Sequence, residues 1–251
     1  MDIAAREREF VGVAGPDAAD YLQRMVSNDV EVLAPGEACP ALLLTAKARV
    51  IAPLVVLRRG EDDFLLLTEP GLGEVVRSHL SRMRLRARCE IESEEHTSVL
   101  LFGGEEAGAF ATDWPGAREA LDAGLSPTLA DEELELRRIE AAIPRWGREI
   151  DDRILPAEAG LDETHVSFSK GCYPGQEPVA RLHYRGHPNR GLRVIELDEV
   201  PEYDAPLLHD GREVGRVTSA TRRDDATVAG LAYVRTEVPG DAPLALAARA
   251  G

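Results

Sequence analysis

Apolar side chains recur at helical spacing in two stretches of the first hundred residues. The first stretch follows Gly-Pro-Asp at residues 15–17, which is typical of a helix start because proline suits the first turn. Its apolar positions lie three and four residues apart, at Ala18, Tyr21, Leu22, Met25 and Val26. The second stretch, residues 73–85, has the same spacing at Val75, Val76, His79, Leu80 and Met83. Both patterns predict amphipathic helices.

Short apolar runs of strand length separate and follow these two helices. They occupy residues 41–45, 50–57, 64–68, 88–92 and 98–102. The order of strands and helices predicts an α+β layer, in which the helices pack on a mainly antiparallel sheet.

The pattern of apolar and polar residues changes twice in the second half of the chain. Residues 134–180 hold several prolines and glycines without a regular period, which is typical of long loops that carry functional sites. Alternation of apolar and polar residues returns in residues 192–197, 206–220 and 227–234, and the middle run contains a hairpin-type Asp-Gly turn. These runs predict a small all-β C-terminal unit.

The composition is that of a folded protein. The chain has 251 residues, of which 44% are hydrophobic, and this excludes disordered and fibrous proteins. No apolar run approaches the roughly 20 residues of a membrane span, and the charged N-terminus lacks the apolar stretch of a signal peptide. The 3 cysteines include no close pair, which favours a reducing compartment. We therefore expect a cytoplasmic protein without membrane contact.

The formal net charge of -16 bears on the partners of the protein. Such a surface repels phosphate backbones at long range, so direct nucleic-acid binding over a broad face is not expected. A local basic groove would escape this argument. Residues 178–193 carry no acid. Their four arginines make the local charge positive, namely Arg181, Arg185, Arg190 and Arg193. They predict either an anion-binding rim for a carboxylated ligand or ion pairs with the protein's own acids.

The segment Lys-Gly-Cys-Tyr-Pro-Gly-Gln-Glu, residues 170–177, is the strongest candidate for chemistry. Gly171 and Gly175 permit tight backbone geometry or the close approach of a ligand. In an extended segment Lys170 and Cys172 share a face, and an ammonium beside the thiol would favour the reactive thiolate. A buried, inert cysteine in a glycine-rich turn is the alternative.

Glu140 is the carboxylate that we single out outside this segment. A carboxylate can accept two parallel hydrogen bonds from the edge of an amino-pyrimidinone, although Glu140 could instead pair with Arg137 or Arg138. The sequence lacks the common motifs of nucleotide binding, zinc proteolysis and serine hydrolysis. Its scattered histidines give no self-contained metal site, and one cysteine cannot hold an iron–sulfur cluster within one chain.

Residues 170–177, followed by PVAR and RGHPNRGL, resemble the signature of the YgfZ-type folate-binding proteins. These proteins are relatives of the aminomethyltransferase of the glycine cleavage system. Further similar stretches are GPDAADYLQRMVSNDV, RRIEAAIPRWGREIDDRILPAEAGL and GREVGRVTSA, so the resemblance runs in order through nearly the whole chain.

The resemblance implies three modules around a central cavity that receives tetrahydrofolate. A folate-binding module would comprise two parts, residues 1–47 and residues 131–188, of which the second holds the Lys-Gly-Cys loop. An inserted ferredoxin-like α+β module would occupy residues 48–130. A small C-terminal β-barrel would occupy residues 189–251.

The resemblance also implies a function. The protein would bind tetrahydrofolate, or a one-carbon derivative, and support the assembly or repair of iron–sulfur clusters, including those of tRNA-modifying enzymes. Cys172 and Lys170 would be its functional residues, and Cys172 would transiently contact the cluster of an iron–sulfur enzyme or cluster carrier. The folate-binding set would be Glu140 at the pterin edge, Arg181 at the anionic tail, and Gly171, Tyr173, Gln176 and Glu177 in the loop.

One departure from the aminomethyltransferases bears on the reaction. Those enzymes carry a catalytic Asp in a Leu-Asp-Asp-Leu-like stretch, whereas this sequence has Ile-Ala-Pro-Leu at residues 51–54. Without a carboxylate to move a proton at a folate nitrogen, aminomethyltransferase activity is not expected. A folate-dependent one-carbon transferase and a thiol-based redox or interaction module without folate are the alternatives.

Overall fold

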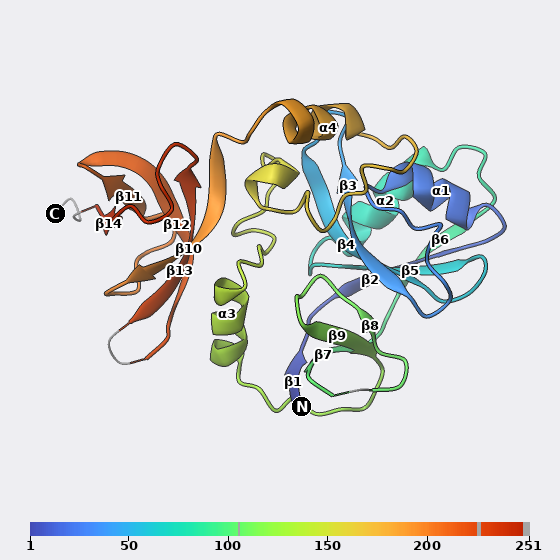
Figure 1. Ribbon diagram of the computed structural model, residues 1–251. Coiled ribbons are helices and arrows are strands. Elements are labelled where there is room, and N and C mark those ends of the chain that lie inside the picture. The colour runs from blue at the N-terminus through green and yellow to red at the C-terminus, as the bar shows by residue number, and fades with distance from the viewer. Residues whose placement is uncertain (105, 225–226, 248–251) are drawn as a thin grey trace.

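The computed structural model describes residues 1–104, 106–224 and 227–247 of the chain. Its strands form three sheets, which we call the first, second and C-terminal sheets (Figure 1). All the strand pairs within them are antiparallel. Among the described residues, no helix combines the length and the apolar character needed to cross a membrane.

The first sheet is buried on both faces. Its strands lie in the order β3 (Ala38–Leu44), β4 (Val50–Arg58), β5 (Asp63–Thr68), β2 (Glu9–Ala14) and β6 (Glu90–Glu94). The helices α1 (Ala18–Met25) and α2 (Gly73–Met83) share a buried core with one face, and Phe110 packs against the other. Burial on both sides explains why β4 and β5 are continuous apolar runs rather than alternating ones.

The second sheet has the order β1 (Asp2–Ala5), β7 (Ser98–Phe102), β9 (Ala117–Leu121) and β8 (Phe110–Ala111). β1 and β2 follow each other along the chain but belong to different sheets. The few residues between them, which include Arg6 and Arg8, therefore cross the junction of the two sheets.

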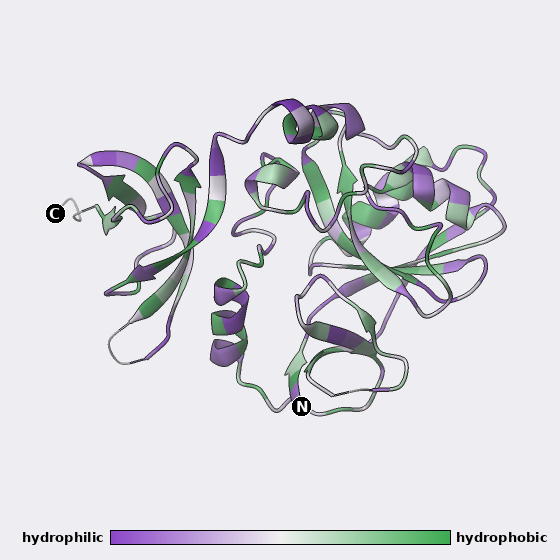
Figure 2. Cartoon of the chain, in the orientation of Figure 1, coloured by the Kyte–Doolittle hydropathy of each residue, from purple (hydrophilic) through white to green (hydrophobic). Residues whose placement is uncertain are grey.

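The C-terminal sheet has the order β10 (Arg190–Leu197), β13 (Val228–Arg235), β12 (Arg212–Arg222), β11 (Pro206–His209) and β14 (Ala245–Leu246). The helix α3 (Asp131–Glu140) packs on it, with Ile139 fully buried against Ala229 and Leu231. Figure 2 shows hydrophilic and hydrophobic bands along α3, as expected for a helix with only one buried face.

The long segment between α3 and β10 connects the C-terminal sheet with the first sheet. It contains the short 3-10 helix η1 (Pro156–Glu158) and the helix α4 (Gln176–Arg185), which lies across the top of the molecule in Figure 1. Ile150, Ile154 and Tyr173 of this segment share a buried core with Leu44 and Val50, at the ends of β3 and β4.

The predicted mixture of helices and antiparallel sheets is confirmed, and so are both amphipathic helices and the Asp-Gly hairpin, whose turn separates His209 from Arg212. The predicted C-terminal barrel is not confirmed, because the described strands form an open sheet with β10 and β14 at its edges. Strands from residues 1–47 pair with strands from residues 48–130 in both other sheets, so these two predicted pieces fold together. The division into modules itself stays a prediction.

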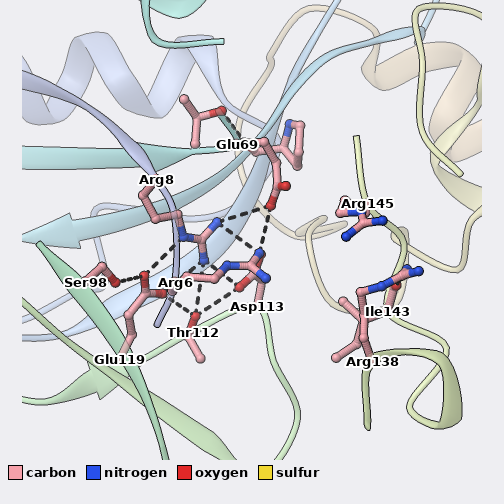
Figure 3. Close-up of polar contacts among 12 residues, drawn as sticks. Arg6, Arg8, Glu69, Ser98, Thr112, Asp113, Glu119, Arg138, Ile143 and Arg145 are labelled. Carbon is pink, nitrogen blue, oxygen red and sulfur yellow. Dashed lines mark hydrogen bonds and ion pairs between the residues drawn. The ribbon is translucent and has the colours of Figure 1, made fainter. Parts of the chain in front are cut away.

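A buried cluster of charges joins the first sheet to the second (Figure 3). The Arg8 guanidinium donates hydrogen bonds to Glu119, at 3.1 and 3.0 Å, and to Asp113, at 2.7 Å. Only 1% of the Arg8 side chain and 0% of the Glu119 side chain are exposed. Glu119 also accepts hydrogen bonds from Ser98 and Thr112, so its carboxylate is fully satisfied.

Replacing Arg8 by methionine should destabilise the fold by about 3–5 kcal/mol, because buried carboxylates would lose their counter-charge. Urea denaturation gives the free energy of unfolding directly. The matched control is Arg77→Met, since Arg77 pairs with Glu74 on the surface of α2 and its loss should leave the free energy of unfolding nearly unchanged. Equal losses of unfolding free energy in the two variants would show that the buried cluster stabilises the fold no more than a surface ion pair does.

Candidate functional site

A cavity lies where the two N-terminal sheets meet the C-terminal part of the chain. Its volume is about 220 Å³. Pro53 comes from β4, Glu69 directly follows β5 of the first sheet, Asp113 follows β8 of the second sheet, and Leu192 comes from β10. The remaining lining residues come mostly from the segment after α3, and they include Ile143, Pro144, Ile150, Leu161 and His165. We call this space the central cavity.

Two carboxylates form the polar wall of the central cavity. Glu69 accepts a hydrogen bond of 2.7 Å from Arg6, and Asp113 accepts one of the same length from Arg8 (Figure 3). Burial alone would raise the pKa of Asp113, but the charges of Arg8 and Arg6 outweigh it and hold that pKa well below its usual range. Asp113 is therefore a permanent anion at the cavity wall.

His165 adds a neutral polar group to the same wall. Burial lowers the pKa of its imidazole to about 4, so the ring carries no charge near neutral pH. Its Nδ1 lies 2.8 Å from the hydroxyl of Thr164, and its backbone carbonyl accepts a hydrogen bond from Ser27 at the end of α1. The lining also includes apolar residues, among them Ile143, Ile150 and Leu161.

A larger cleft of about 700 Å³ shares Glu69 with the central cavity. Three arginines line it, Arg6, Arg138 and Arg145, together with five carboxylates, those of Glu7, Glu69, Asp131, Glu132 and Glu135. Arg138 is buried and is held by Glu135, Glu149, Ser219 and the Ile143 carbonyl. Arg145 is 41% exposed and has one long ion pair of 3.5 Å with Glu135, which leaves its guanidinium available to a ligand.

The position predicted to correspond to the transferase Asp lies at the central cavity. Pro53 lines the cavity, and its carbonyl accepts a hydrogen bond of 2.9 Å from the buried hydroxyl of Thr68. The chain therefore presents a proline ring, and no side-chain acid or base, at this point of the wall.

Lys170 has a different role from the one that its sequence position predicts. Its ammonium donates hydrogen bonds to the carbonyls of Val26, at 2.8 Å, and Asn28, at 2.6 Å, just beyond α1. Burial lowers the pKa of Lys170 to about 8. Within the described structure no hydrogen bond joins Lys170 to Cys172, and Lys170 is buried whereas Cys172 is exposed. Lys170 anchors the loop instead.

Three neighbours of Cys172 complete this anchorage. Tyr173 is buried, with its ring centre 5.5 Å from the Lys170 ammonium. Gly175 has a φ of 84°, and a Cβ atom there would lie 2.6 Å from the Thr45 carbonyl, so only glycine suits the position. Gln176 Nε2 lies 3.5 Å from the Gly171 carbonyl. Cys172 itself is exposed, which contradicts the alternative of a buried thiol.

The other predicted site residues lie apart from the central cavity. Glu140, at the end of α3, accepts a hydrogen bond of 2.9 Å from Arg223 of the C-terminal sheet, and it is not among the residues that line the cavity. Arg181 and Glu177 are exposed on α4. Glu140 thus forms an ion pair, but with Arg223, and the expected pairing with Arg137 or Arg138 is wrong.

Sequence reasoning missed the carboxylates that do line the cavity. Glu69 and Asp113 follow β5 and β8 in polar surroundings that resemble ordinary turns. The only hint was the pair of arginines at residues 6 and 8, which interrupts two apolar strands and demands buried partners.

Comparison with known proteins agrees with this architecture. Residues 7–112 match the GCVT N-terminal domain. The "tRNA-modifying protein YgfZ" of Edwardsiella ictaluri (strain 93-146) is 28% identical, with 93% of this chain and 84% of that protein covered. The "Aminomethyltransferase" of Listeria monocytogenes serotype 4a (strain HCC23) is 25% identical, with 89% and 75% covered.

The chain is thus similar, over most of its length, both to a YgfZ-type protein and to aminomethyltransferases. Its fold matches the crystal structure of glycine cleavage system aminomethyltransferase T from Bartonella henselae with a TM-score of 0.80. That match covers 100% of this chain and 82% of the other at 20% sequence identity, and so it shows the aminomethyltransferase-like fold alone.

Replacing Gly175 by alanine should destabilise the protein by more than about 1 kcal/mol, because the new Cβ would meet the Thr45 carbonyl in a strained backbone conformation. Gly171→Ala is the matched control in the same loop, since no atom lies within 4 Å of a Cβ at that position. Chemical denaturation compares the two variants. Hydrogen exchange of residues 170–176 should accelerate in Gly175→Ala only, and similar exchange in both variants would contradict the anchorage.

Proposed function

We propose that the chain binds tetrahydrofolate in the central cavity and supports iron–sulfur enzymes that modify tRNA. The observation that carries the first part is the presence of both carboxylates and apolar side chains in the lining of one small cavity. The homology to a protein named for tRNA modification supports the second part.

The residues of the central cavity suit the pterin ring of a folate. The edge of an amino-pyrimidinone presents two parallel N–H donors. The arginines contact Glu69 at Oε1, so its second carboxylate oxygen is left as an acceptor for the ring, and Asp113 beside it adds negative charge. Ile143, Ile150 and Leu161 offer an apolar surface to the ring faces. The volume lies below the roughly 300–1,000 Å³ of pockets for drug-sized ligands, so the cavity would hold the ring alone.

The acidic tail of the folate would then lie in the larger cleft, where Arg145 is available to a carboxylate. In this arrangement the chain binds, orients and shields the ring, and Asp113 keeps its charge without taking up a proton. Tetrahydrofolate, when bound, would accept a one-carbon unit, and a one-carbon derivative of it would supply one. Pro53 gives the cavity no proton carrier at the transferase position, which favours binding over one-carbon transfer.

Cys172 would serve a partner rather than the folate. Its thiol is exposed, and Cys172 does not line the central cavity. A thiolate is a ligand that iron–sulfur clusters accept, and an anchored loop presents it at a defined place. A redox or interaction module without folate would use the same thiol, so the two halves of the proposal need separate tests.

Calorimetric titration of tetrahydrofolate into the reduced protein under anaerobic conditions tests the folate half. We expect a micromolar Kd, weakened about 10- to 100-fold in Glu69→Gln, because a charged hydrogen bond to the ring would be lost. Glu140→Gln is the matched control and should bind as the parent does. If only Glu140→Gln weakens folate binding, Glu140 rather than Glu69 binds the edge of the pterin ring. If the parent protein binds no folate, the proposed folate site is refuted.

Cys172→Ser tests the other half in a strain that lacks the protein. The extent of a tRNA modification made by an iron–sulfur enzyme, measured by mass spectrometry, should fall to the level of the uncomplemented strain. The control is Cys89→Ala at matched protein abundance, since Cys89 is buried in the first sheet's core and cannot reach a partner. Full modification with Cys172→Ser would exclude a role for the thiol.

A further inference from the structure

A cationic segment comprises the end of α2 and the turn that follows it. Residues 81–88 read Ser-Arg-Met-Arg-Leu-Arg-Ala-Arg and contain no acid, in a chain whose formal net charge is -16. Arg88 pairs with Asp17, at 2.8 Å. Within the described structure Arg82, Arg84 and Arg86 form no ion pair with a carboxylate, so the turn retains an excess of positive charge.

Leu85 at the tip of this turn is exposed and adopts an unfavourable backbone conformation. Its exposed fraction is 87%, and its φ is 50°. The Ala87 amide donates to the Arg84 carbonyl, at 2.9 Å, which closes a turn with Leu85 in its second position. A positive φ at that position is typical of Gly, Asn or Asp, so a leucine there contributes neither burial nor an easy turn to the fold.

A groove of about 740 Å³ lies between this turn and α1. Tyr21, Arg24 and Met25 line it on the α1 side, and Met83, Leu85 and Arg86 line it on the side of the turn. Two of the 3 methionines of the chain thus border one groove, and methionine side chains adapt to apolar partners of varied shape.

We propose that this groove binds an acidic segment of another protein, which places an apolar side chain between the methionines and carboxylates beside Arg84 and Arg86. The excess positive charge requires an anionic partner, and the hollow shape suits an inserted side chain better than a flat lipid surface does. The groove shares no lining residue with the central cavity, so the proposal does not depend on folate binding.

Selection of a phage-displayed library of random peptides on the full-length protein tests this proposal. We expect enriched peptides with an apolar residue beside Asp or Glu, whose affinity is then measured by fluorescence anisotropy. Arg86→Glu should weaken the binding at least about tenfold, the usual effect of losing an anchoring residue. Arg212→Glu, an equal charge change at an exposed position of β12, should leave the binding unchanged.

Leu85→Gly separates binding from folding. Glycine accepts the positive φ, so the variant should be at least as stable as the parent while it loses peptide affinity. The proposal is overturned if no peptide is enriched, or if the selected peptides bind the parent and Leu85→Gly equally. Co-sedimentation with phosphatidylglycerol vesicles that Leu85→Gly abolishes would assign the turn to lipid instead, and would also overturn it.

Discussion

The burial of Arg8 is the constraint on which the arrangement of the two N-terminal sheets depends. Three carboxylates, those of Glu69, Asp113 and Glu119, lie around Arg8 in an interior that offers them little water. Each carboxylate comes from a different segment, so the guanidinium holds the end of β5, the loop after β8 and β9 in one relative position. Desolvation makes any other arrangement costly, because a charge displaced from the cluster would be buried without a partner.

The same cluster shapes the central cavity. Asp113 and Glu69 have one side toward the arginines and another toward the cavity, so the charges that hold the sheets together also form the polar wall of the site. Such a wall is preorganised, since the carboxylates cannot turn away or gain a proton without disrupting the junction. A ligand that donates a hydrogen bond to Glu69 therefore meets a fixed acceptor.

The sequence predicted elements that depend on neighbouring residues, but it did not predict contacts between residues that are far apart in the chain. Helical spacing and apolar runs predicted α1, α2 and the strands β3, β4, β5 and β6 of the first sheet, though not β2, because each pattern reflects the burial of one element. The partners of Arg8 and Lys170 could not be predicted in this way. Arg8 and Glu119 are 111 positions apart, and Lys170 and Val26 are 144 apart. Proximity in sequence instead suggested that Lys170 and Cys172 share a face, as they would in an extended loop. In the structure the Lys170 ammonium binds the carbonyls of Val26 and Asn28.

Two turns illustrate how a conflict between residue and conformation can be interpreted. At Gly175 the backbone is left-handed and crowded, and the chain has glycine there, so the local conformation and the packing of the Cys172 loop agree. At Leu85 the backbone is also left-handed, yet the chain has a large apolar residue that nothing within the fold buries. Natural sequences are locally consistent with their folds, and departures concentrate at functional positions. The reason for the leucine therefore lies outside the folding of this chain, in a contact that the turn makes with another molecule.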